Sequence, residues 1–180
     1  VTFNAFGAIS QVDFYLSDNG GIGGGGSYPL APFDTMTGVV AGLNSYSWQV
    51  PDEIGNLCRI KVQDHNNPAV FDESDANFEI KGKVTVLEPN TGNETWYVGD
   101  SAQIKWKPEG TYLNVKIEYS TNGFSDESQT YFITQTSAGA PGVEHAYTWA
   151  AVDPRISDNC KVRVSDPNSP TVADISDNPY

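Results

Sequence analysis

Apolar and polar residues alternate in short runs along this chain, and no run follows the 3.6-residue period of a helix. In the segment 58–62, for example, Cys58, Ile60 and Val62 share one face, whereas Arg59 and Lys61 share the other. Such runs, bounded by Gly, Pro, Asn and Asp, are typical of half-buried strands. In the second half of the chain they predict strands over 83–87, 102–107, 113–120, 130–135, 144–149 and 160–165. This pattern predicts an all-β fold of antiparallel β-sandwiches.

The same pattern occurs twice. The segment 12–20 (VDFYLSDNG) is echoed by 115–123 (VKIEYSTNG), and the segment 58–64 (CRIKVQD) by 160–166 (CKVRVSD). The offset stays near 102 residues, which is the length of a small domain and too long for a solenoid repeat. We therefore expect two tandem domains, residues 1–81 and 82–180.

The two copies differ at their ends. The first copy lacks counterparts of residues 84–103, and the second stops at Tyr180, which matches Phe78. A sandwich that lacks one strand leaves an unpaired hydrophobic edge. We expect either that the chain belongs to a longer array, which is the favoured alternative, or that a neighbouring chain supplies the strand. The junction 80–83 has no Pro/Ser-rich spacer, which predicts limited hinge freedom.

The net charge of the chain limits the classes of partner that we expect. The net charge is −13, with ten acids against three bases in residues 1–81 and thirteen against seven in residues 82–180. A uniformly acidic surface argues against nucleic acid and anionic membranes as partners. No apolar run approaches the ~20 residues that span a bilayer, so direct membrane insertion is not expected. The charge is compatible with a solvated extracellular surface and with cation binding.

Residues suited to covalent catalysis are few. Alternation places Cys58 and Cys160 at matched positions inside each domain, so both are expected to be buried thiols without a disulfide partner. His65 and His145 occupy unrelated positions, and no recurring Ser/His/Asp or Cys/His set is apparent. The glycine-rich segment 20–27 is followed by neither a helix nor a lysine, which favours a flexible connection over a phosphate loop. We therefore expect no enzyme activity and no organic cofactor.

The acidic segments 64–75 and 166–177 are the best candidates for a metal site. Ca²⁺ takes six to eight oxygen ligands from carboxylates, amides and backbone carbonyls. The alternative is that these Asp and Asn side chains cap turns by bonding to their own backbone. The candidate Ca²⁺ ligands are Asp64, Asn66, Asp72, Asp75, Asp166, Asn168, Asp174 and Asp177.

Aromatic residues also recur in both copies. Tyr46 and Trp48 match Tyr147 and Trp149, which favours a place in the core over a carbohydrate-stacking platform. Trp96 follows a turn and is expected to be the freest aromatic side chain.

The segment 89–99 (PNTGNETWYVG), followed by Ile104-Lys-Trp106, resembles a recurrent extracellular module. It looks like the immunoglobulin-like modules that occur in tandem on bacterial cell-surface and secreted proteins. It is also similar to a module of Ser/Thr-rich, GPI-anchored wall proteins, and surface-layer proteins are plausible hosts. The resemblance implies immunoglobulin- or fibronectin III-like sandwiches.

These observations lead to a functional expectation. The leading one is a structural, non-catalytic, extracellular repeat module of a surface layer, stalk or adhesin. Its expected partners are neighbouring copies of the repeat or a protein lattice, with cell-wall glycan as a further candidate. The alternative is a carbohydrate- or protein-binding accessory module of a larger secreted enzyme.

Overall fold

The computed structural model describes residues 1–180, and its regular elements are β-strands apart from one 3₁₀ turn, Glu127–Gln129. Every strand pair is antiparallel, which confirms the predicted all-β fold of packed antiparallel sheets. Contacts divide the chain into two compact units, Val1–Ile80 (unit 1) and Lys81–Tyr180 (unit 2). No helix is long and apolar enough to cross a bilayer.

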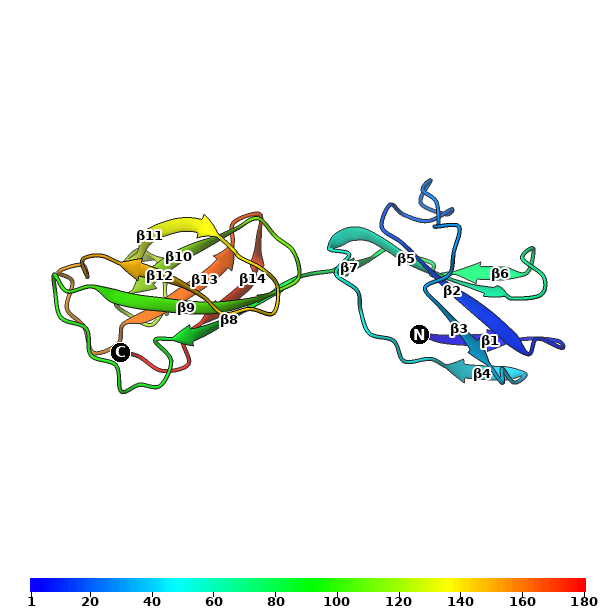
Figure 1. Ribbon diagram of the computed structural model, residues 1–180, viewed down its shortest axis with the longest axis horizontal. Coiled ribbons are helices and arrows are strands. Elements are labelled where there is room, and N and C mark those ends of the chain that lie inside the picture. The colour runs from blue at the N-terminus through cyan, green and yellow to red at the C-terminus, as the bar shows by residue number, and fades with distance from the viewer. The chain divides into compact units, whose positions relative to one another are not determined.

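Unit 2 contains two sheets that face each other (Figure 1). One sheet has the strand order β12-β9-β8, and the other has the order β11-β10-β13-β14. The strands are β8 (Lys83–Glu88), β9 (Ala102–Glu109), β10 (Asn114–Ser120), β11 (Thr130–Ser137), β12 (His145–Trp149), β13 (Lys161–Asp166) and β14 (Ser169–Ile175).

The core of unit 2 lies between these sheets because alternate residues of each strand point inward. β8 and β9 contribute Val86, Ile104 and Trp106, all at most 2 % exposed. The indole N–H of Trp106 donates to the Ala138 carbonyl at 3.0 Å, so the only polar atom of this side chain is satisfied. The facing sheet contributes Val115, Ile117, Tyr119, Val162 and Val164.

Unit 1 contains a sheet of order β3-β2-β5-β6, in which β7 also pairs with β5, and a separate two-stranded sheet, β1-β4. Its core is smaller than that of unit 2 and is built around a cluster of Ala5, Val12, Phe14 and Val39. The strands are β1 (Thr2–Ala5), β2 (Gln11–Ser17), β3 (Asp34–Thr37), β4 (Gly42–Ser45), β5 (Gly55–Asp64), β6 (Phe71–Glu73) and β7 (Phe78–Ile80).

Both cysteines are buried and free, as the alternation predicts. Cys58 lies on β5, and Cys160 directly precedes β13. Burial raises the pKa of each thiol, although hydrogen bonds from neighbouring groups oppose it. Both side chains therefore act as small core residues, and neither is a reactive thiolate.

Two strands lie where the sequence predicts loops. β6 falls inside the acidic segment 64–75, and β14 falls inside the acidic segment 166–177. β14 is the last strand of its sheet, and such an edge tolerates Pro170 because one side of the strand needs no hydrogen-bond donor. Asp72 and Asp174 consequently sit on strands, at matched places opposite Val62 and Val164.

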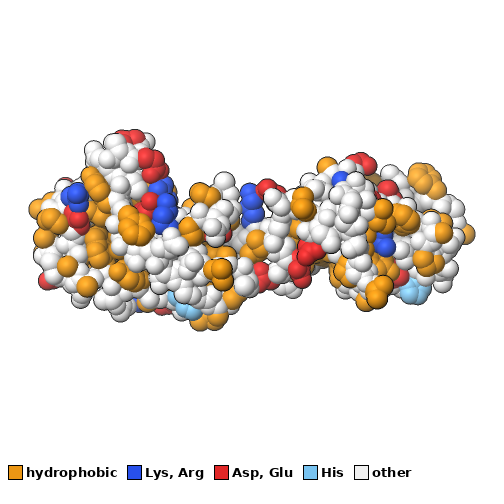
Figure 2. Space-filling model, turned by 90° about the horizontal axis from the view of Figure 1, so that it is seen from above, with side chains coloured by type: hydrophobic (Ala, Val, Ile, Leu, Met, Phe, Trp, Pro, Cys, Tyr) orange, Lys and Arg blue, Asp and Glu red, His pale blue; other side chains and the backbone are white.

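Several basic side chains on the surface form ion pairs with acidic ones. On the face shown in Figure 2, lysine and arginine side chains lie among acidic and scattered hydrophobic ones. The ion pairs include Lys105 with Glu88 at 2.7 Å and Arg163 with Glu118 at 2.9 Å. Such pairs satisfy basic groups within the chain.

Candidate functional site

In unit 1 the predicted metal ligands lie at separate points along one hairpin. Asp64 ends β5, and its Oδ1 accepts a hydrogen bond from the backbone N–H of Asn66 at 2.9 Å. Asp72 lies on β6 and Asp75 lies beyond its end, and both are exposed. The Asp64–Asn66 bond is the turn-capping role that the sequence offers as the alternative to metal binding.

In unit 2 the matching carboxylates form hydrogen bonds with other parts of the same unit. Asp166 is 8 % exposed and accepts from the N–H of Asn168 at 2.8 Å. Asp174 Oδ2 accepts from the N–H of Val86 at 2.7 Å, which ties β14 to β8 of the other sheet. Asp177 Oδ2 accepts from the side-chain amide of Asn90 at 3.1 Å.

The structure does not bring the eight candidate ligands together. No group of three or more His, Cys, Asp or Glu side chains is placed to hold a metal ion. The reason is local: the hairpins β5-β6 and β13-β14 keep their carboxylates at different positions along paired strands, and several already accept backbone N–H groups.

The glycine-rich segment is an ordered turn built around one carboxylate. The Glu73 carboxylate accepts from the backbone N–H groups of Ile22 and Gly23 and from the Tyr28 hydroxyl. Arg59 lies 3.3 Å from it. Burial acts to raise the pKa of Glu73, but these hydrogen bonds and Arg59 leave it below its ordinary value. The predicted flexible connection is therefore pinned to β6, an arrangement that the sequence does not reveal because the partners lie 50 residues apart.

The glycines of this turn are required by close packing. A Cβ added at Gly26 would lie 2.1 Å from the carbonyl oxygen of Asn19, and one added at Gly24 would lie 2.3 Å from that of Gly20. Real Cβ atoms do not approach backbone this closely, so the run of glycines is explained by its own turn.

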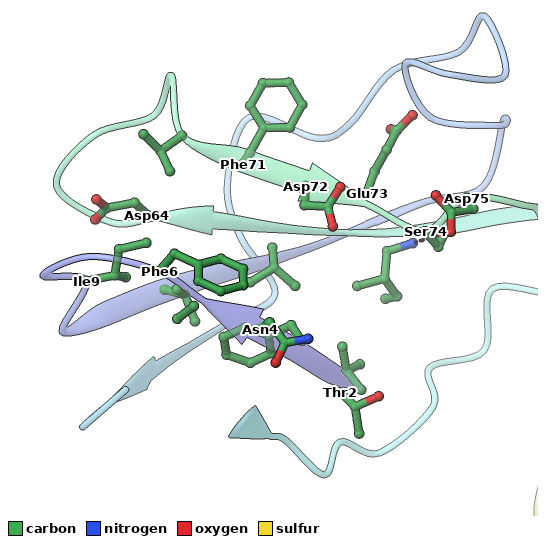
Figure 3. A pocket seen from close by; sticks show the side chains of 17 residues that line it. Thr2, Asn4, Phe6, Ile9, Asp64, Phe71, Asp72, Glu73, Ser74 and Asp75 are labelled. Carbon is green, nitrogen blue, oxygen red and sulfur yellow. Dashed lines mark hydrogen bonds between the residues drawn. The ribbon is translucent and has the colours of Figure 1, made fainter. Parts of the chain in front are cut away.

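The main concavity of unit 1 is a groove of about 550 Å³ between β1 and β6. Figure 3 shows Thr2, Asn4 and Phe6 on the β1 side and Phe71 and Asp72 across the gap. The apolar floor is formed by Phe3, Ala5, Val12, Ile60 and Val62.

The groove has an acidic rim, and three of the predicted metal ligands belong to it. Asp64, Asp72 and Asp75 all line the cavity. The Asp64 carboxylate accepts from Asn66, whereas the carboxylates of Asp72 and Asp75 make no hydrogen bond with the chain. The groove therefore offers an apolar floor, the free carboxylates of Asp72 and Asp75 and the outer edge of a two-stranded sheet.

The matched aromatic residues differ between the units. Tyr147 and Trp149 pack against the core of unit 2, as predicted, and Tyr46 stacks on Phe14 at a centroid distance of 4.2 Å. Trp48 lies outside the core of unit 1 and is half-buried, packing on Phe33 at 4.8 Å.

Trp48 also lines a second cavity of about 460 Å³ in unit 1. Its polar lining residues are Asp18, Gln49 and Glu53. An aromatic face beside hydrogen-bonding side chains is the kind of surface that ligand pockets use to fix orientation.

Trp96 is less free than predicted. Its ring centroid lies 4.2 Å from that of Tyr180 and 6.3 Å from that of Trp149. The turn before Trp96 is held by Glu94, whose carboxylate accepts from three backbone N–H groups of that turn, and this places the indole against the unit 2 core.

Comparison with known proteins assigns no family to these features. No protein-family model matches the chain, and no curated protein matches it. The resemblance to tandem surface modules therefore stays a prediction from the motifs. What the chain does has to be inferred from the geometry of its two units.

Proposed function

We propose that this chain is a structural, non-catalytic module of an extracellular protein, in which tandem immunoglobulin-like domains serve a surface layer, stalk or adhesin. The observation that carries the proposal is that polar residues matched between the copies make the same internal hydrogen bonds. Asn19 N–H donates to Ser17 Oγ at 3.3 Å, and Asn122 N–H donates to Ser120 Oγ at 3.2 Å. Residues kept in both copies for turns and strand ends support a scaffold.

The matched acidic segments support the same proposal. Asp64 and Asp166 cap equivalent turns, and the N–H groups of Ser74 and Ser176 donate to Ile60 and Val162 at 2.9 Å. These groups hold the hairpins in place, as a scaffold requires.

The connection between the units also favours load transmission. Only Lys81 and Gly82 separate β7 from β8. A connector of two residues adds very little extensible length between the units, so a pulling force on the chain is transmitted directly from one unit to the other. Neighbouring copies of the same module are the partners that this proposal implies.

Single-molecule pulling of the whole chain tests the proposal. We expect two unfolding events, with contour lengths in the proportion of 80 to 100 residues at about 3.3–3.6 Å each. Unfolding of either unit at forces no higher than those that extend an unstructured chain would overturn the load-bearing proposal.

A carbohydrate- or protein-binding accessory module is the second candidate, and the cavity beside Trp48 favours it. Retention of the chain on insoluble wall glycans separates the two functions. The structural function does not require such retention, whereas retention that Trp48→Ala abolishes and Trp149→Phe preserves would favour the binding module.

Calcium can be tested in the same protein. Asp166 and Asp174 already accept backbone N–H groups. We therefore expect that neither Ca²⁺ nor a chelator changes the melting temperature of either unit. A rise in melting temperature that Asp72→Asn removes would instead support the predicted calcium site.

A further inference from the structure

Unit 2 shows which element belongs in the groove of unit 1. There, β8 runs antiparallel to β9, with Val84 opposite Pro108 and Val86 opposite Trp106. Val84 and Val86 are 2 % and 0 % exposed. β8 is the edge strand of its sheet and also contacts β13 and β14, so it packs against the facing sheet along one side of the unit.

The elements around β8 have counterparts in unit 1. β9, β13 and β14 correspond to β1, β5 and β6 through the offset near 102, and the pair Val164–Asp174 corresponds to Val62–Asp72. No strand of unit 1 occupies the position of β8, because β1 pairs only with β4. The groove of about 550 Å³ lies at this position.

Matched side chains are more exposed around the groove of unit 1 than beneath β8 in unit 2. Trp106 is 2 % exposed and Val164 is 0 % exposed under β8, whereas their counterparts Phe3 and Val62 are half-buried. An apolar floor that is covered in one unit and open in the other favours burial by a ligand of the same shape as β8.

The backbone of β1 is arranged to receive a strand. The Val1 amino group donates to the Tyr46 carbonyl at 2.7 Å, and the N–H of Tyr46 donates to the Val1 carbonyl at 2.8 Å. In an antiparallel pair the bonding direction alternates, so the N–H and C=O groups of Thr2 and Asn4 point to the opposite edge, toward the groove.

Asp72 supplies a polar anchor across the gap. Its counterpart Asp174 accepts the N–H of Val86 at 2.7 Å, whereas the Asp72 carboxylate is exposed and makes no hydrogen bond with the chain. A strand laid along β1 would present a backbone N–H to Asp72 as β8 does to Asp174.

We propose that the groove between β1 and β6 is an acceptor site for an extended peptide strand from outside the two units. The strand binds antiparallel to β1, places branched apolar side chains at two alternating positions on the floor, and donates a backbone N–H to Asp72. Asp64 on the rim favours a strand with a basic residue at its start, as Lys83 is in β8. This mode adds a strand to an exposed sheet edge. The inference does not depend on the proposed structural function.

The probe is a synthetic peptide with the sequence of residues 82–88 (GKVTVLE), added to the full chain. We expect saturable NMR shifts centred on Thr2, Asn4 and Asp72, and slower exchange of the Thr2 and Asn4 amides. A control peptide with Asp in place of both valines should produce neither effect. Absence of saturable shifts at millimolar peptide, or equal shifts with the control peptide, would overturn the proposal.

Variants of the chain sharpen the test. Asp72→Ala should weaken peptide binding about tenfold, because a hydrogen bond to a charged group is lost. Asp75→Ala, on the same rim, should weaken it far less. Concentration-dependent dimerisation of the chain without peptide that protects Thr2 and Asn4 would instead identify a second copy as the occupant and overturn the proposal.

Discussion

Ser74 and Ser176 perform the same task at different depths. Ser176 is 1 % exposed, and its Oγ accepts the N–H of Val162 at 3.2 Å, whereas Ser74 is half-buried and accepts the N–H of Ile60 at 3.3 Å. Removing a buried acceptor leaves a donor without water or protein partner. We expect Ser176→Ala to cost about 1–3 kcal/mol of unfolding free energy and Ser74→Ala clearly less.

Denaturant unfolding followed by amide NMR in each unit measures both values. Equal losses for the two variants would mean that water reaches Val162 N–H as readily as Ile60 N–H, which contradicts the burial of Ser176.

Glu94 makes unit 2 sensitive to acid. Partial burial acts to raise its pKa, but hydrogen bonds from the N–H groups of Asn90 and Thr91 lower the pKa of Glu94 from 4.5 to about 2. A group whose folded pKa is depressed stabilises the fold above its unfolded pKa, and this stability is lost as the pH falls through the folded pKa. The wild type should therefore melt at a higher temperature than Glu94→Gln. This difference should be largest above pH 4.5 and should shrink as the pH falls toward 2.

Thermal melts across this pH range, with Glu144→Gln as a surface control, provide the measurement. Glu144 is exposed, so its substitution should change the melting temperature only slightly. A constant difference for Glu94→Gln would show that the turn does not depend on the charged carboxylate.

At the scale of elements, β6 and the glycine-rich turn are coupled through Glu73. Its carboxylate holds the N–H groups of Ile22 and Gly23, so Glu73→Ala should release the turn while β5 and β6 stay paired. Backbone ¹⁵N relaxation should then show increased fast motion over residues 22–26. Asp75→Ala, which touches none of these groups, is the matched control, and unchanged relaxation in Glu73→Ala would refute the anchoring role.

The elements differ in how far their sequence predicts them. The strands with strict alternation, such as the one that contains Cys58, Ile60 and Val62, are predictable because one face must be buried. β14 is not, since Pro170 and Asp174 are typical of turns, and only its place at a sheet edge makes Pro170 compatible with a strand. The acidic rim of the groove follows in part from the acidic segment 64–75, whereas the contact of Asp174 with β8 depends on packing between residues 88 positions apart.

At the scale of the whole molecule, the two units are expected to unfold in separate steps. Unit 2 contains thirteen buried hydrophobic side chains, whereas unit 1 contains eight and has an open groove. Less apolar surface is thus removed from water in unit 1, and its transition should come at the lower temperature.

Val12 and Val115 provide a matched pair for this prediction, because they occupy equivalent strand positions and are 3 % and 0 % exposed. Val→Ala at either site should cost roughly 2 kcal/mol through lost burial and a residual cavity. Because distant, independent sites contribute separately, calorimetry should show Val12→Ala lowering only the first transition and Val115→Ala only the second. A single transition that moves with either substitution would contradict this prediction. It would mean that the two units unfold cooperatively through their two-residue connector. A lower stability of unit 1 could then not be ascribed to its smaller core.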